Sequence, residues 1–484
     1  MKKMKRIVAA ILMFAVLVVS TPALAWEVET PGETAARYIK GIVSKIAEDY
    51  RFGVDTQEMY EAIMDYVMRE NPELLEGAIS AAASTLDQHS EYFPAKELVS
   101  FVEDVTGAYV GIGVTIQYTD QGIEIVEVNP NGGAKQADLR VGDLIVKVDG
   151  QNVVGMTTGE VTSLVRGEEN TTIALELLRD EERLTADVKR MKLYTETVSS
   201  RITDDGIGYI YISNFASSTP ESMKRVLDEM RNRNVRKFLI DVRDNPGGEL
   251  GSVLDVLELF VPKNRVLTTL KYNNEKRNRV IKSAAKFSLT PNRKIVILAN
   301  ENSASAAELF AGTMQNLKLA KVVGVDTFGK GSMQEFMGLI SPSTAELGDI
   351  KLSVAEFTKP DGSQINGIGI APDVRVANVY VPYDMSKLTP MTFGDRYQVG
   401  SKGNDVLAIE ERLKVLGLEP GAVDGVFDED TKRATETFQK AAELSVYGVM
   451  DFTTQNTLND WMAEVEVEQD KQYEKAYEIL KKEK

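Results

Sequence analysis

Two serines lie where a strand-like segment runs into a helical one, and one of them could act as a nucleophile. Residues 295–299 form an apolar run, Ser303 and Ser305 follow it, and residues 309–314 continue with helical spacing. The first N–H groups of a helix lack intrahelical partners, and the helix dipole favours negative charge, so an oxyanion could be held at this point. The alternative is that either serine only caps the helix, which is the ordinary role of serine there.

A serine hydroxyl needs a base, and the composition leaves few candidates. The chain has no cysteine and a single histidine, His89, which is far from Ser305 in sequence. Lys330 follows the apolar run 322–325 and is flanked by glycines that let the backbone turn closely. Burial would lower the pKa of its amine and make the neutral form available near neutral pH. Lys330 is therefore the preferred base, with His89 as the alternative, and Gln334 could orient the pair.

A third segment that could take part in catalysis is the end of a strand that is followed by glycines. Residues 241–248 read Asp-Val-Arg-Asp-Asn-Pro-Gly-Gly, and the backbone N–H groups of such a turn can face a substrate carbonyl. An ordinary tight turn is the alternative reading.

In this order, Asn-Pro-Gly-Gly at 245–248, Ser-Ala-Ser-Ala-Ala-Glu at 303–308 and Thr-Phe-Gly-Lys-Gly at 327–331 resemble the carboxyl-terminal processing peptidases. The resemblance covers about residues 35–375. It implies a serine endopeptidase that cleaves proteins near their C-termini, with a serine–lysine dyad on a crotonase-like (ClpP/crotonase-type) core. By motif position the nucleophile is Ser305, the base is Lys330, and Gln334 orients the lysine.

The resemblance also assigns the residues around the dyad. Ser303 becomes structural, and Ala307 stands where the family usually has a further serine. The oxyanion donors would be the N–H of Ala306 and the N–H of Gly247 or Gly248, and the sequence does not distinguish between the two glycines.

The amino terminus predicts export. Residues 2–6 carry four basic side chains, residues 7–19 are apolar, and residues 23–25 are Ala-Leu-Ala, which is the pattern of a secretory signal peptide. The apolar run is shorter than the roughly 20 residues a bilayer requires, so cleavage is favoured over a retained anchor. An extracytoplasmic location follows, with association with the cell wall or membrane left open.

Composition excludes several classes of site and partner. The net charge of −17 disfavours nucleic acid. The absence of cysteine rules out disulfides and thiolate sites, and a single histidine rules out multi-histidine zinc sites, so we expect no metal and no cofactor.

The chain is too long for one hydrophobic core, and its pattern of apolar and polar residues changes from one segment to the next. We expect an α/β multidomain protein. Its segments are a signal peptide (1–25), a helical N-terminal arm (26–98), an inserted β-rich PDZ domain (99–190), a Ser/Lys protease core (191–380), a linker (381–397), a three-helix module (398–462) and a charged tail (463–484). Because the arm is amphipathic, we expect it to form a homodimer. Because the tail is densely charged, we expect it to be a solvated helix or a frayed end.

The β-rich segment resembles a PDZ domain. Successive N–H groups of its Gly-Ile-Gly loop can form a nest for a free carboxylate, and the adjoining strand edge can accept an extended peptide, so substrates with free C-termini are the implied partners. The residues expected to bind the peptide are Tyr109, Val110, Gly111, Ile112, Gly113, Val114 and Arg166. Arg166 could contact substrate or the protease core, or be an exposed surface arginine.

Residues 403–439 resemble a three-helix peptidoglycan-binding domain, which implies peptidoglycan as a partner. Asp428 and Glu443 stand where that family commonly has glycine, so protein contact or plain packing remains the alternative.

Two other functions are weighed against the peptidase. One is an inactive secreted scaffold that binds protein C-termini and the cell wall. The other is a penicillin-interacting transpeptidase, because Ser283 and Lys286 match the S-x-x-K pattern, but the companion S-D-N and K-T-G elements do not occur.

Overall fold

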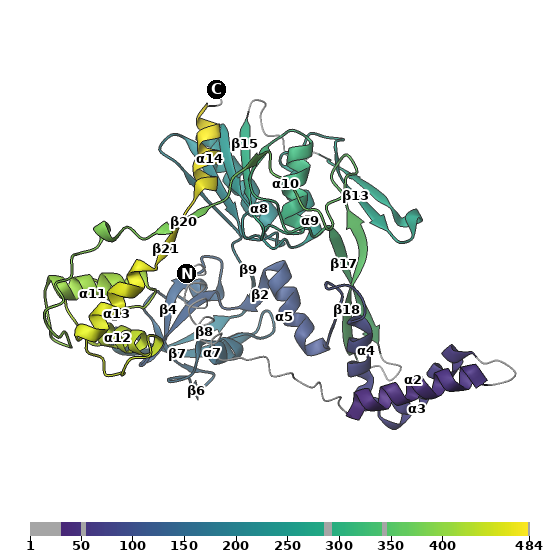
Figure 1. Ribbon diagram of the computed structural model, residues 1–484, viewed down its shortest axis with the longest axis horizontal. Coiled ribbons are helices and arrows are strands. Elements are labelled where there is room, and N and C mark those ends of the chain that lie inside the picture. Colours follow the sequence, from purple (N-terminus) through teal and green to yellow (C-terminus); the bar gives the residue numbers. More distant parts are fainter. Residues whose placement is uncertain (1–30, 50–54, 285–292, 341–345, 483–484) are drawn as a thin grey trace. The chain divides into compact units, whose positions relative to one another are not determined.

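The computed structural model describes residues 31–49, 55–284, 293–340 and 346–482 (Figure 1). The expected signal peptide lies outside these residues. The chain divides into two compact units, one of residues 71–377 with 471–484 and one of residues up to 70 with 378–470. None of the helices in the described ranges is long and apolar enough to cross a membrane.

The larger unit is built on a six-stranded sheet in the order β10-β11-β12-β15-β16-β19. β10 runs antiparallel to β11, and the remaining neighbours are parallel. Parallel strands that are covered on both faces need nearly continuous apolar runs, which β12 and β15 supply. The strands span Val198–Ile202 (β10), Ile207–Ile212 (β11), Lys237–Asp241 (β12), Lys294–Ala299 (β15), Lys321–Gly324 (β16) and Val374–Arg375 (β19).

Helices cover both faces of this sheet. Because successive strand residues point to opposite faces, Phe238 and Ile240 of β12 pack with α8, α9 and α10, whereas Leu239 packs with α14. The helices span Thr219–Asn232 (α8), Leu250–Glu258 (α9), Ala306–Asn316 (α10) and Lys471–Lys482 (α14). The expected α/β core is therefore present.

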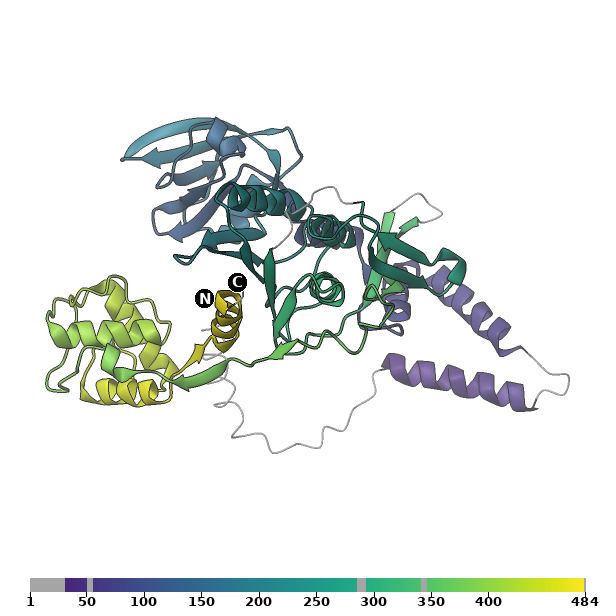
Figure 2. The same ribbon diagram turned by 90° about the horizontal axis from the view of Figure 1, so that it is seen from above.

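Helix α14 differs from the expected solvated or frayed tail. In Figure 2, α14 is the helix next to the label C. Ala476 and Leu480 are fully buried against the sheet, and Tyr473 and Tyr477 pack at the edge of the same cluster. These residues recur at helical spacing and form one apolar stripe, which the many charged residues on the other faces of the helix obscure in the sequence.

A second, antiparallel sheet of the same unit brings distant segments together. β18 pairs antiparallel with β17 on one edge, and on the other edge with β13 and with β1 (Figure 1). The strands span Glu91–Phe93 (β1), Val266–Tyr272 (β13), Arg279–Lys282 (β14), Ser332–Ile340 (β17) and Glu346–Phe357 (β18), with a 3-10 turn at Glu275–Arg277 (η2). The segment expected to be wholly helical up to residue 98 thus contains a strand that joins the core.

The β-rich module forms its own sheet in the order β3-β4-β5-β7-β8, with β6 paired to β5. Its core is made by inward-facing residues such as Ile123, Ile145 and Leu175. The elements span Ala108–Gly111 (β2), Val114–Thr119 (β3), Gly122–Val128 (β4), Gly133–Gln136 (α6), Leu144–Val148 (β5), Gln151–Asn152 (β6), Thr158–Val165 (α7), Thr172–Arg179 (β7), Glu182–Lys189 (β8) and Met191–Tyr194 (β9). β2 and β9, the first and the last strand of this module, pair with each other.

Helices precede this module, as the apolar spacing predicts. They span Pro31–Asp49 (α2), Thr56–Glu70 (α3), Pro72–Leu74 (η1, a 3-10 turn), Leu75–Ala83 (α4) and Ala95–Thr106 (α5). On α2 and α3, Ile42, Ile46 and Met64 remain exposed, and no described residue of α3 is buried.

The smaller unit contains the three expected helices around Ile409, Phe427 and Phe438. They span Asn404–Val415 (α11), Glu429–Ala441 (α12) and Phe452–Ala463 (α13). The expected linker is more ordered than predicted: β20 (Val379–Pro382) pairs with β21 (Glu466–Gln469), a 3-10 turn follows at Met385–Lys387 (η3), and Leu388 and Met391 are buried in the module's core.

Candidate active site

Ser305 occupies a backbone conformation that few non-glycine residues adopt. It lies between β15 and α10 with φ 54° and ψ −114°, a strained geometry that costs about 1–3 kcal/mol and persists only where its surroundings hold it. Sharp strand-to-helix turns of this kind present nucleophilic serines in other hydrolases. The neighbouring Ser303 is fully buried and its hydroxyl donates to the carbonyl of Val242 at 2.8 Å, which is a structural role.

The glycine turn after β12 lies directly against this serine. A Cβ added to Gly247 would stand 2.8 Å from the Cβ of Ser305 and 3.0 Å from the backbone nitrogen of Ala306, so only glycine fits there. The N–H of Gly247 already donates to Oδ1 of Asn245 at 2.8 Å. Within the described residues, the N–H groups of Gly248 and Ala306 make no hydrogen bond, which leaves these two available as donors.

Glu308 ties Ser305 to the loop that carries Lys330. Its carboxylate is fully buried, and Oε2 accepts hydrogen bonds from the N–H of Ser305 at 2.8 Å and of Lys330 at 2.7 Å. Oε1 accepts from Oγ1 of Thr327 at 2.5 Å and from the N–H of Gly329 at 2.6 Å. Because both backbone nitrogens lie so close to one oxygen, Ser305 and Lys330 are held as near neighbours.

The environment of Lys330 makes its amine unusually easy to deprotonate. Burial lowers the pKa of this side chain, and the positive charge of Lys351 lowers it further, while Asp87 and Glu308 act in the opposite direction. Burial also raises the pKa of Glu308, although the four hydrogen bonds that its carboxylate accepts act in the opposite direction. Among the described residues, no hydrogen bond joins the Lys330 amine to the Ser305 hydroxyl.

Among the described residues, no hydrogen bond joins Gln334 to Lys330. Its Nε2 donates instead to the hydroxyls of Ser332 and Ser353, both at 3.0 Å. The hydroxyl of Ser353 in turn donates to Oδ1 of Asp87 at 3.0 Å. The sequence assigned no role to Asp87 or Ser353, because nothing in their spacing shows that β1 places residues 87–90 beside β18.

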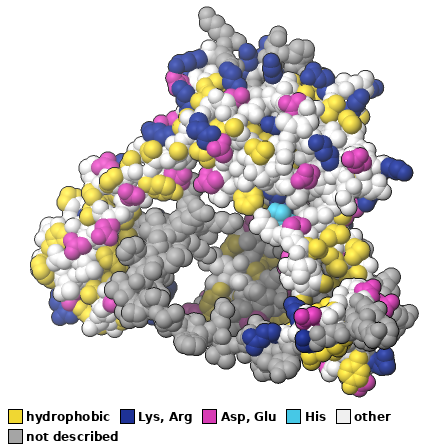
Figure 3. All heavy atoms as spheres, turned by 45° about the vertical axis from the view of Figure 1, so that its right-hand side comes forward, with side chains coloured by type: hydrophobic (Ala, Val, Ile, Leu, Met, Phe, Trp, Pro, Cys, Tyr) yellow, Lys and Arg dark blue, Asp and Glu magenta, His cyan; other side chains and the backbone are white. Residues whose placement is uncertain are grey.

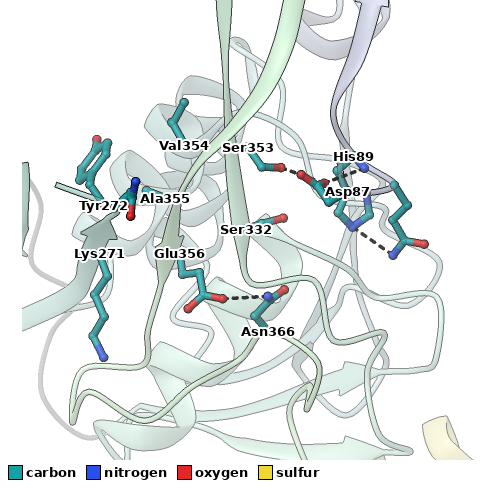
Figure 4. Close-up of a pocket in the computed structure, with 12 residues that line it drawn as sticks. Asp87, His89, Lys271, Tyr272, Ser332, Ser353, Val354, Ala355, Glu356 and Asn366 are labelled. Carbon is teal, nitrogen blue, oxygen red and sulfur yellow. Dashed lines mark hydrogen bonds between the residues drawn. The ribbon is translucent and has the colours of Figure 1, made fainter. Parts of the chain in front are cut away.

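A cavity of about 550 Å³ opens beside these groups (Figure 4). Most of the lining residues have polar side chains, and they come from the 87–89 loop, from strands β13, β17 and β18, and from the loops at Asn273 and Asn366. The lining residues are Asp87, Gln88, His89, Lys271, Tyr272, Asn273, Ser332, Ser353, Val354, Ala355, Glu356 and Asn366. His89, the alternative base, is visible at the surface (Figure 3), and burial together with the charge of Lys330 lowers the pKa of its ring.

The expected peptide-binding loop lies between β2 and β3. Tyr109, Val110 and Gly111 belong to β2 and pair with β9, Ile112 is buried, and Gly113 has φ 83° before β3 begins at Val114. Arg166 pairs with Glu103 of α5 at 2.6 Å, and its guanidinium lies 6.0 Å from the ring centre of Tyr109. Arg166 is thus an exposed arginine that is paired with Glu103, and among the described residues no hydrogen bond joins it to the protease core.

Three stretches of the chain match known protein families. Residues 206–376 match peptidase family S41, residues 124–179 match the PDZ domain, and residues 402–458 match a putative peptidoglycan binding domain. The probable CtpA-like serine protease of Staphylococcus haemolyticus is 32% identical over 422 residues, covering 86% of this chain and 82% of that protein. The chain belongs to peptidase family S41.

Two proteins of Bacillus subtilis are also similar to this S41 member over most of their length. The carboxy-terminal processing protease CtpA is 30% identical over 476 residues, which is 98% of each chain. The carboxy-terminal processing protease CtpB is 29% identical over 411 residues, which is 83% of each. The resemblances drawn from the sequence motifs, to these peptidases, to the PDZ domain and to the peptidoglycan-binding domain, are confirmed.

Proposed function

We propose that this S41 peptidase is an extracytoplasmic serine endopeptidase that cleaves proteins near their C-termini with Ser305 and Lys330. The observation that carries the proposal is the single carboxylate oxygen of Glu308 that both backbones share. It keeps a strained serine and a lysine of lowered pKa side by side. The fold is proposed to be crotonase-like, with helices on both faces of its parallel sheet.

The reaction follows from this geometry. The neutral Lys330 amine accepts the hydroxyl proton as Ser305 Oγ bonds to the carbonyl carbon of the scissile peptide. The N–H groups of Gly248 and Ala306 hold the oxyanion, and the lysine then gives its proton to the departing amine. Water attacks the acyl-enzyme in the reverse sense, which releases the new C-terminus and restores the serine.

Ser305→Ala and Lys330→Ala test the dyad on an unstructured polypeptide with a free C-terminus. We expect Ser305→Ala to abolish turnover and Lys330→Ala to lower kcat by about 10²–10⁴-fold, the usual worth of a general base. Equal turnover by wild type and both variants would favour the inactive scaffold. Covalent labelling by a penicillin would favour the transpeptidase.

The PDZ domain is proposed to recruit substrate tails through the N–H groups of the Gly111–Gly113 loop. Amidation of the substrate's C-terminus removes the charge that this loop would bind, so it should raise KM more than it changes kcat. Equal kinetics for the acid and the amide would contradict this role. Unchanged cleavage of a tailed peptide by Arg166→Ala would likewise exclude Arg166 from tail recognition.

The remaining parts are proposed to locate the enzyme. Residues 1–25 direct secretion, the module at 398–462 binds peptidoglycan, and the exposed apolar residues of α2 and α3 form a homodimer. Sedimentation of the full chain with purified peptidoglycan and measurement of its molar mass in solution test the last two statements separately.

A further inference from the structure

Asp87, Ser353 and Gln334 form a hydrogen-bonded chain in the neighbourhood of Lys330. The hydroxyl of Ser353 donates to Oδ1 of Asp87 at 3.0 Å, and Nε2 of Gln334 donates to the hydroxyl oxygen of Ser353 at 3.0 Å (Figure 4 shows the first of these). The same Nε2 also donates to Ser332 at 3.0 Å. These side chains are contributed by a loop and two strands that are distant in the sequence.

The fold assembles this chain through the register of β18. Ser353 is the Cα partner of Gln334 in the β17–β18 pair, and Glu91 of β1 is opposite Lys351. The loop before β1 therefore lies beside Ser353. The N–H of Ser353 donates to the hydroxyl of Ser90 in this loop at 3.0 Å. Several contacts position Asp87 against Ser353, and this arrangement does not depend on a single bond.

The Asp87 carboxylate is well anchored and ionised. Its Oδ2 accepts from the hydroxyl of Ser90 at 2.7 Å, and its Oδ1 accepts from the N–H of His89 at 2.8 Å as well as from Ser353. Burial opposes ionisation, but these hydrogen bonds keep the pKa of Asp87 below its usual value. An ionised carboxylate can only accept hydrogen bonds.

That restriction sets the direction of the whole chain. Ser353 has one hydroxyl proton, which is directed to Asp87, so only its lone pairs face Gln334. Gln334 must then present its NH₂ group to Ser353, because its carbonyl oxygen would meet another acceptor. The two ends of a glutamine amide have nearly the same shape, so hydrogen-bond partners decide which way it is turned. Here they leave Oε1 as the acceptor.

We propose that Asp87 is a positioning residue, which acts through Ser353 to keep Oε1 of Gln334 available to the Lys330 amine and so orients the lysine toward Ser305. The inference rests on the proposed Ser305–Lys330 function and deepens it. Asp87 has a second, electrostatic effect on the same amine. The charges that face Lys330 are Lys351 on β18, Asp87 before β1 and Glu308 on α10, and the ring of His89 is the other titratable group nearby.

Asp87→Asn in the full-length chain tests the proposal, because asparagine keeps the shape but can donate as well as accept. We expect kcat to fall about tenfold to a hundredfold through misorientation of the lysine, with KM within twofold of wild type. Because the Asp87 charge raises the pKa of Lys330, its loss should also move the acid limb of the kcat/KM profile to lower pH. A merely structural residue would not move that limb.

Two further substitutions separate the hydrogen-bond chain from general damage to the loop. Ser353→Ala breaks the chain and should reproduce the fall in kcat, whereas Ser353→Thr keeps the hydroxyl and should restore at least half of the wild-type kcat. Leu86→Ala changes only the exposed side chain next to Asp87, which does not line the cavity, and should leave kcat within twofold of wild type.

The outcomes that overturn the inference are distinct from those that overturn the dyad. A kcat within twofold of wild type in Asp87→Asn, an unmoved acid limb, or equal kcat values for Ser353→Ala and Ser353→Thr would reject the positioning role. A fall in kcat in Leu86→Ala as large as that in Asp87→Asn would reject it in favour of general damage to the loop. Full activity of Lys330→Ala would instead reject the proposed function itself.

Discussion

Replacement of Glu308 by glutamine tests how the active site is held together. The wild-type carboxylate accepts four hydrogen bonds, two on each oxygen, and every one of its partners is a donor. Glutamine has nearly the same shape but only one acceptor oxygen. Whichever way the amide is turned, its NH₂ group faces two donors, so two hydrogen bonds are lost in a fully buried position.

The size of the effect follows from those two bonds. A hydrogen bond to a charged group contributes about 1.5–3 kcal/mol, so the loss amounts to about 3–6 kcal/mol, compared with about 5–15 kcal/mol for the stability of a typical domain. The loop 327–330 would relax away from Ser305, and a shift of about 1 Å between reacting groups can lower the rate 10²-fold. We therefore expect a protein that still folds at low temperature but has lost at least 10²-fold in kcat.

Denaturant unfolding and steady-state kinetics of the full-length chain measure the two effects. Glu301→Gln is the matched control, because the same chemical change is made at an exposed position seven residues upstream and should alter stability by less than about 0.5 kcal/mol. Two results would contradict this reasoning: a free energy of unfolding of Glu308→Gln within about 1 kcal/mol of the wild-type value, or a kcat within about threefold of wild type. Both limits are smaller than the expected effects. Either result would mean that the shared carboxylate does not hold Ser305 and Lys330 together.

Three further predictions use other parts of the structure. Lys351→Met removes a charge that lowers the pKa of Lys330, so the acid limb of the kcat/KM profile should move to higher pH, opposite to the shift in Asp87→Asn; an unmoved limb would contradict this. Arg179→Ala strips the bidentate partner, at 2.6 and 2.7 Å, from the buried Asp143 carboxylate and should cost about 3 kcal/mol in unfolding at pH 7. Burial opposes ionisation of Asp143, but its hydrogen bonds hold its pKa below 3.8, so this stability is present above 3.8 and should disappear as pH falls through the lower folded value. Leu480→Ala should destabilise the core by about 2–5 kcal/mol, whereas truncation of a solvated tail would cost nothing measurable.

Much of this architecture could be predicted because it depends on local patterns. The apolar run at residues 295–299 predicted the strand β15, and the motifs around Ser305 and Lys330 predicted the turns that carry them. The tail helix α14 was read wrongly as solvated, because a narrow apolar stripe among many charges is indistinguishable from a surface helix until its partner sheet is known.

The sequence by itself determined which side chains can do chemistry: with no cysteine and a single histidine, the choice of a base narrowed to very few residues. Tertiary structure decided how these side chains are held. It placed the Glu308 carboxylate between Ser305 and Lys330 and brought Asp87 beside Ser353 across 266 positions of sequence. Within the described part of the chain, it also left the N–H of Gly248, and not that of Gly247, without a hydrogen bond. The physical reason is that hydrogen bonds are directional and short, so their partners are defined by strand register and turn geometry, which no local pattern encodes.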